Sequence, residues 1–224
     1  MDCRFGREFD SDRSEKMILK SKRNIEKEGI SVNQLYPVVE CEENIETGIM
    51  KFRIYDDCRS FSWKTIDNFS IESVLLENYS KDIHADIIHY TYNDLDKEFF
   101  YRFYLENEDS RIAIVQLEKA MVDIISDELS IKDIMININE LGFNNENIEM
   151  QLKAFFKEAS KQDIIKFSNN MYNKVMDVNK YLLEVIVDNI KLYKEPEVEN
   201  LLMEIYMNAS CSKELLNTID NYWS

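Results

Sequence analysis

Glycine is scarce in this sequence, and its scarcity excludes several kinds of enzyme. Only four glycines occur among 224 residues, at positions 6, 29, 48 and 142. A phosphate-binding loop needs closely spaced glycines, because its backbone N–H groups must approach the phosphate without a Cβ atom in the way. The sequence contains no Walker-type loop, no dinucleotide-binding fingerprint and no Gly-x-Ser-x-Gly nucleophile elbow. Nucleotide-driven chemistry is therefore not expected.

Histidine and cysteine are also rare, and their positions argue against a metal site. The four cysteines, at positions 3, 41, 58 and 211, form no Cys-x-x-Cys pair, so we expect free thiols and no zinc. His84 and Asp86 are two residues apart on an expected strand and share one face, whereas His89 falls on the opposite face. This set holds too few ligands, so we expect no metal, no cofactor and no catalytic residue.

Long apolar runs are missing as well. The longest ones, such as Ile112 to Val115, span only a few residues. A helix needs about 20 apolar residues to cross a bilayer, so no membrane partner is expected. The first residues also lack the apolar stretch of a signal peptide. The sequence therefore predicts a cytoplasmic protein.

Negative charge, in contrast, is abundant. Forty-three acidic residues face twenty-seven lysines and arginines, for a formal charge of −16. Residues 30–142 hold most of the excess, with ten basic and twenty-three acidic residues. Such a chain repels phosphate, so direct binding to nucleic acid is not expected. The densest acidic segments predict a docking face for a protein partner, formed by Glu40, Glu42, Glu43, Glu46, Asp94, Asp96, Glu106, Glu108 and Asp109.

Residues 30–109 have the pattern of an antiparallel sheet. Apolar and polar side chains alternate over residues 50–55 and again over 60–64, which is typical of half-buried strands. The segments Ile83–Tyr92 and Phe99–Leu105 predict two more strands, joined as a hairpin by a polar turn. We expect four to six strands in this region.

Residues 110–224 have the pattern of helices. Ser130 and Asp133 resemble a capping box, and Gly142 is suited to end the helix that follows. Pro196 suits the first turn of a later helix. We expect a helical bundle over residues 110–224 that packs with the β region as one domain, because a small sheet alone leaves a face to bury.

Within the helical region, apolar residues recur with a seven-residue spacing. They are Ile164, Met171, Val175, Val178, Leu182, Val185 and Leu192. One helix of about 30 residues, or two helices joined by a kink, would carry this stripe. Packing within a bundle explains it, and a homodimer seam along the 164–192 helix is the alternative.

Residues 1–29 form a charged segment with eight basic and seven acidic residues. Helical spacing predicts a surface helix from Ser14 to Glu28 that ends at Gly29. The whole chain is therefore expected to be an α+β protein. Its antiparallel sheet lies in the N-terminal half and its helical bundle in the C-terminal half.

These observations favour a binding protein over an enzyme. An acidic face speeds the encounter with a basic surface and excludes wrong partners. Basic surfaces are typical of nucleases, toxins and other nucleic-acid enzymes, because their phosphate grooves need lysine and arginine. The hypothesis is a non-enzymatic inhibitor of such a protein, of the immunity-protein or phage anti-defence type, acting as a charge mimic. The alternative is a structural or adaptor subunit that oligomerises through its C-terminal helices.

Overall fold

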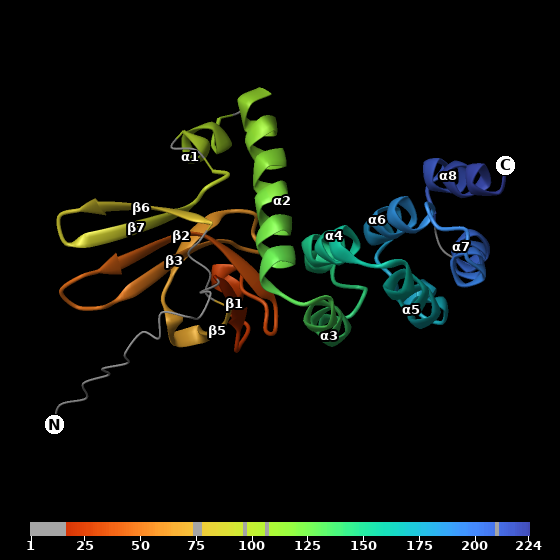
Figure 1. Ribbon diagram of the computed structural model, residues 1–224, viewed down its shortest axis with the longest axis horizontal. Coiled ribbons are helices and arrows are strands. Elements are labelled where there is room, and N and C mark those ends of the chain that lie inside the picture. The colour runs from red at the N-terminus through yellow and green to blue at the C-terminus, as the bar shows by residue number, and fades with distance from the viewer. Residues whose placement is uncertain (1–16, 74–77, 96–97, 106–107, 209–210) are drawn as a thin grey trace.

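A computed structural model describes residues 17–73, 78–95, 98–105, 108–208 and 211–224. In these residues a seven-stranded antiparallel sheet precedes eight helices, which confirms the predicted α+β class (Figure 1). The long helix α2 (Glu108–Glu128) stands between the sheet and the helices that follow it in the chain (Figure 1). No helix of the described residues is long and apolar enough to cross a membrane.

Strand β2 is the centre of the sheet. It pairs on one side with β3, which pairs with β4. On its other side, the first part of β2 pairs with β1, followed by β5, and the second part pairs with β7, followed by β6. The strands are β1 (Ile18–Ser21), β2 (Leu35–Asn44), β3 (Met50–Tyr55), β4 (Phe61–Lys64), β5 (Phe69–Ser73), β6 (Tyr79–His84) and β7 (Ile87–Tyr92).

The alternation expected for residues 50–55 is present in β3. Phe52 and Ile54 are buried, whereas Lys51 is exposed and Arg53 is partly buried. In β2, Val38 and Cys41 are fully buried. The buried apolar residues of the sheet and of the helices form one cluster.

The helix predicted from Ser14 to Glu28 is wrong over the residues that the structure describes. Ile18–Ser21 is strand β1, held between β2 and β5, and only a single 3-10 turn forms at Glu26–Glu28. Ile18 and Leu19 are buried together, which a surface helix would not allow. Two adjacent apolar residues that are both buried are typical of an interior strand. Gly29 does end the 3-10 turn, in the left-handed conformation.

The predicted hairpin between Ile83–Tyr92 and Phe99–Leu105 is also wrong. Strands β6 and β7 make the hairpin instead, and Ala85 turns the chain with a φ of 52°. Phe99–Phe103 forms the short helix α1. The helical turn brings its three phenylalanines onto Phe61 of β4, with ring centroids 4.9–5.9 Å apart. Aromatic clustering thus overrides the strand pattern.

After α2 the chain forms three successive helix pairs, α3/α4, α5/α6 and α7/α8, which extend away from the sheet (Figure 1). Helices α2, α4, α6 and α8 contact one another in turn, and α5 contacts α7, so the pairs stack in two layers. The helices are α3 (Ile131–Leu141), α4 (Glu149–Glu158), α5 (Lys161–Tyr172), α6 (Lys180–Ile190), α7 (Pro196–Asn208) and α8 (Lys213–Trp223).

Local signals explain most of these helix ends. The Ser130 side chain accepts a hydrogen bond from the Asp133 backbone N–H, and Gly142 is the C-cap of α3, as predicted. Ser160 makes a full capping box with Asp163 at the start of α5. Pro196 is the first residue of α7, where its missing N–H costs no hydrogen bond.

The seven-residue stripe is divided among α5, the linker that follows it, α6 and the residues just after α6, rather than lying on one continuous helix. Residues 173–179 separate them and include a 3-10 turn at Val175–Asp177. Ile164, Met171 and Leu182 are each 1% exposed and belong to the core of the chain. Leu192 is 77% exposed and follows the end of α6. The stripe therefore packs the helix pairs against one another, which is the bundle interpretation.

Candidate functional site

The predicted docking residues on β2 are partly neutralised by neighbouring strands. The Arg53 guanidinium lies 2.8 Å from Glu40, and the His89 ring lies 3.5 Å from Glu42. Glu43 is half-buried on the same strand, and Glu46 is exposed in the turn that follows. The Arg53 cation therefore offsets the charge of Glu40 in this part of the predicted face.

The other predicted docking residues lie elsewhere. Asp94 pairs with Lys119 of α2 at 2.7 Å. Glu108 and Asp109 are in the first turn of α2, where Arg111 lies 3.3 Å from Glu108. Asp96 and Glu106 lie outside the described residues. The described members of the predicted set thus occupy three places: β2 and its turn, the turn after β7, and the start of α2.

The two histidines share a face, contrary to the sequence-based prediction. Their ring centroids are 5.8 Å apart, and His84 lies 3.3 Å from Asp82. His84 pairs with Ile87 across the β6–β7 turn, so the chain reverses between the histidines and the face of His89 changes with it. In the part of the chain that the structure describes, no three metal-ligating side chains gather to hold an ion.

A groove lies at the junction of the sheet and the helix stack. We call it the junction groove, and its volume is about 980 Å³. Its walls come from the start of β2, the β3–β4 loop, α2, the start of α4, and α6. The apolar residues among its lining are Leu35, Ile114, Leu117, Met121, Met150, Leu182 and Val185. The volume is at the upper end of the range for ligand pockets.

The junction groove is strongly acidic. Two of the residues lining it are basic, Arg59 and Lys153, and six are acidic: Asp56, Asp57, Glu118, Glu149, Glu184 and Asp188. Lys153 is held between Glu149 at 2.7 Å and Glu118 at 3.4 Å. Burial lowers its pKa, but these two carboxylates outweigh that effect and raise it overall, so Lys153 stays charged. Glu184 and Asp188 are exposed on one face of α6, one turn apart.

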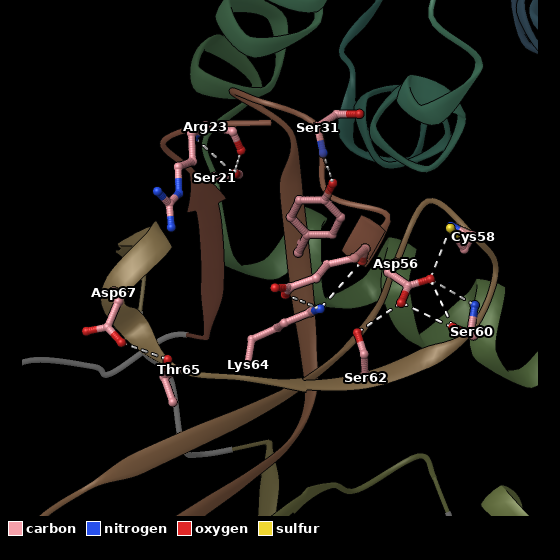
Figure 2. A network of polar contacts seen from close by, with 12 residues as sticks. Ser21, Arg23, Ser31, Asp56, Cys58, Ser60, Ser62, Lys64, Thr65 and Asp67 are labelled. Atoms are coloured by element: carbon pink, nitrogen blue, oxygen red, sulfur yellow. Dashed lines mark hydrogen bonds and ion pairs between the residues drawn. The ribbon is translucent and has the colours of Figure 1, made fainter. Parts of the chain in front are cut away.

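The loop between β3 and β4 is held rigidly by Asp56, which is buried (Figure 2). The Asp56 carboxylate accepts hydrogen bonds from the backbone N–H groups of Cys58 and Ser60 and from the hydroxyls of Ser60 and Ser62. The backbone N–H of Asp57 donates to the Gly29 carbonyl. The loop is therefore fixed before any partner binds.

Asp57 is presented to the groove by two hydroxyl donors. The Tyr36 hydroxyl donates to one carboxylate oxygen at 2.9 Å, and the Ser31 hydroxyl donates to the other at 2.6 Å. Burial, with the negative charge of Asp57, raises the pKa of Tyr36 well above its usual value. Tyr36 therefore keeps its proton at neutral pH and continues to donate. The two hydroxyls therefore hold the Asp57 side chain in one orientation at the lining of the groove.

The acidic residues of the groove were not predicted as a site from the sequence. They come from the β3–β4 loop, α2, α4 and α6, which lie far apart in the chain. The Asp56-Asp57 pair was the only local signal, because adjacent acids next to a strand are suited to a turn.

The chain matches no protein-family model, no curated protein and no solved structure. The arrangement of the groove is therefore the basis for a functional proposal. Its lining contains neither histidine nor cysteine among the residues that the structure describes. The chemistry available there is charge pairing, hydrogen-bond acceptance and apolar contact.

Proposed function

We propose that this chain is a non-enzymatic acidic binding protein that docks on a basic surface of a protein partner. The best-matched partners are nucleases, toxins and other nucleic-acid enzymes, whose phosphate-binding surfaces are rich in lysine and arginine. The role would be that of an inhibitor of the immunity-protein or anti-defence type. The observation that supports this most strongly is the junction groove, whose lining contains six acidic and two basic residues beside apolar side chains.

The rigidity of the groove also supports binding. The β3–β4 loop is fixed by Asp56, so docking costs little conformational entropy there. Cys41, Cys58 and Cys211 are free thiols, which favours a reducing compartment, and we propose a cytoplasmic location.

Affinity capture from the native host with paired charge-reversal variants tests this proposal. The groove variant is Glu184→Lys with Asp188→Lys, and the control is Glu214→Lys with Asp220→Lys on α8, which changes the charge equally on exposed residues. We expect the wild type and the control to retain a basic protein that the groove variant loses. Binding of that protein should also weaken steeply with added salt. Retention of no basic partner by the wild type would refute the proposal.

Self-association through the C-terminal helices is the second candidate function. It is favoured by exposed apolar side chains on α7 and α8, namely Met203, Tyr206, Met207 and Trp223. Light scattering over a range of concentrations tests it. A mass that rises to that of a dimer, and that Met207→Glu returns to that of a monomer, would support self-association. A constant monomer mass would exclude it.

A further inference from the structure

We propose that the hairpins β2–β3 and β6–β7 form a second docking surface, which receives an amphipathic helix of the partner through a basic residue that pairs with Glu43. We call this surface the hairpin face, and it consists of Glu43, Ile45, Met50, Ile83 and Ile88. None of these residues lines the junction groove. Because the hairpin face adds a contact for the same basic partner, it rests on the proposed function.

The register of the sheet places four of these side chains in one row across four strands. Ile83 of β6 lies opposite Ile88 of β7. Ile88 also lies opposite Glu43 of β2, and Glu43 lies opposite Met50 of β3. Residues directly opposed in an antiparallel sheet share a face, so the row presents three apolar side chains and one carboxylate on one side of the sheet.

The row continues an apolar face that the protein buries further along the same strands. Two residues along β2, β3 and β7, this face carries Cys41, Phe52 and Tyr90, which are all buried. Helix α2 contacts β2 there. Ile83, in contrast, is 56% exposed, and both hairpins project away from the helices (Figure 1). A helix laid on the hairpin face would therefore extend the cover of a face that is already buried in part.

Glu43 supplies an unpaired charge within this row. The other two glutamates of β2 have partners, since Arg53 lies 2.8 Å from Glu40 and His89 lies 3.5 Å from Glu42. Glu43 is half-buried and makes no ion pair with any residue that the structure describes. Covering a carboxylate with apolar groups alone is costly, so a ligand that covers this row must supply a cation.

Further acidic residues surround the apolar side chains. Ile45 in the β2–β3 turn is 53% exposed, and its N–H donates to the Asp86 carbonyl at 2.8 Å, which holds the two hairpin turns side by side. Glu46 and Asp86 are both exposed in these turns. Lys81, on the same face of β6, lies over the Tyr90 ring and makes no ion pair with Glu43.

The charge around the hairpin face decides among its occupants. A basic amphipathic helix presents apolar side chains with cations beside them, which matches the isoleucines, Met50 and the acidic residues around them. A nucleic acid would place phosphates against Glu43 and be repelled. A second copy of this chain would bring its own excess of acidic residues to the same place. The hairpin face is therefore complementary to a basic helix of another protein.

Fluorescence anisotropy with two labelled amphipathic helical peptides tests this proposal. The peptides share a leucine face and differ in the residues beside it, lysine in one and glutamine in the other. We expect the lysine peptide to bind the wild type about tenfold more tightly than the glutamine peptide. Glu43→Gln should remove that difference, whereas the control Glu72→Gln on β5 should keep it. Ile83→Ser should weaken both peptides about tenfold, and Ile71→Ser, at a residue 44% exposed on β5, should weaken neither.

Two further measurements separate the hairpin face from the junction groove and from self-association. Glu184→Gln with Asp188→Asn in the groove should leave binding of the lysine peptide unchanged. Loss of the peptide in that variant but not in Ile83→Ser, or no binding of either peptide to the wild type, would overturn the hairpin face as a docking site. The proposed function would still stand if affinity capture retained a basic partner. A dimer mass in light scattering that Ile83→Ser returns to a monomer would assign the face to a second copy instead. Circular dichroism confirms that each variant is folded.

Discussion

Two glycines, Gly29 and Gly48, share a left-handed backbone but differ in their surroundings. Their φ angles are 60° and 65°. A Cβ atom added to Gly29 would lie 2.8 Å from the Sγ atom and 3.0 Å from the backbone nitrogen of Cys58. A Cβ atom on Gly48 would meet nothing within 4 Å. The backbone strain is common to both positions, whereas the steric clash belongs to Gly29 alone.

We therefore predict that Gly29→Ala destabilises the protein more than Gly48→Ala. Left-handed strain should lower the free energy of unfolding of Gly48→Ala by about 1 kcal/mol. Gly29→Ala should lose at least about 1 kcal/mol more, because Asp56 holds the Cys58 backbone in place. Urea denaturation measures both values. Equal losses would mean that the β3–β4 loop shifts at no cost.

Asp56 and Asp67 form a second matched pair at the residue scale (Figure 2). Asp56 is buried and accepts four hydrogen bonds, whereas Asp67 is exposed and accepts one from Thr65. Asp56→Ala should lower the free energy of unfolding by about 3 kcal/mol, because buried donors lose their acceptor. Asp67→Ala should change it by less than about 0.5 kcal/mol. Thermal and urea unfolding distinguish the two outcomes.

At the scale of elements, the seven-residue stripe along α5 and α6 has two explanations, packing within the helix stack and a seam between two copies. Its two leucines distinguish them. Leu182 is 1% exposed inside the helix stack, and Leu192 is 77% exposed. We expect Leu182→Ala to lower the free energy of unfolding by about 2–5 kcal/mol and Leu192→Ala to leave it nearly unchanged. Urea denaturation of both variants at two protein concentrations is the measurement. A concentration-dependent loss in Leu192→Ala would instead indicate a seam between two copies.

The elements that the sequence predicted well are those with strong local signals. Strand β3 follows from its alternation of apolar and polar residues, and the ends of α3 follow from Ser130 and Gly142. Strand β1 and helix α1 were missed because their neighbours determine them. β1 lies between β2 and β5, and α1 forms because three phenylalanines pack on Phe61. Such long-range contacts leave no periodicity in the sequence.

The candidate site could be predicted from the sequence even less well than the fold. The predicted docking residues were chosen for local acidic density, but folding pairs Glu40 with Arg53 and Asp94 with Lys119. The groove residue Glu118 lies far along the chain from Glu184 and Asp188, and the stacking of α2, α4 and α6 brings them to the same groove. Residue counts predicted an acidic binding surface, but its location depends on tertiary packing.

At the scale of the whole molecule, several acidic groups of the core are held in their neutral form. Burial raises the pKa of the Cys41 thiol to about 12, with a smaller contribution from Glu43. Burial likewise raises the pKa of Tyr92 to about 12, assisted by Asp123. Tyr79 has a raised pKa for the same reason, and its hydroxyl donates to the Val38 carbonyl. These groups ionise more readily in the unfolded chain than in the folded protein.

The protein should therefore unfold cooperatively at alkaline pH. In the folded state the pKa values are raised above the ordinary 9.0 of cysteine and 10.0 of tyrosine, so between those values and about pH 12 the folded protein binds more protons than the unfolded chain. The stabilisation that these neutral groups contribute is fully present below the ordinary pKa values. It is lost as the pH rises through this window. Tyrosinate absorbance and circular dichroism, recorded together, should show the buried tyrosines ionising in one step with unfolding. Tyr79→Phe should shift the unfolding transition to higher pH, because one ionising group is removed. Ionisation of all the tyrosines near pH 10 without loss of helix would contradict this account.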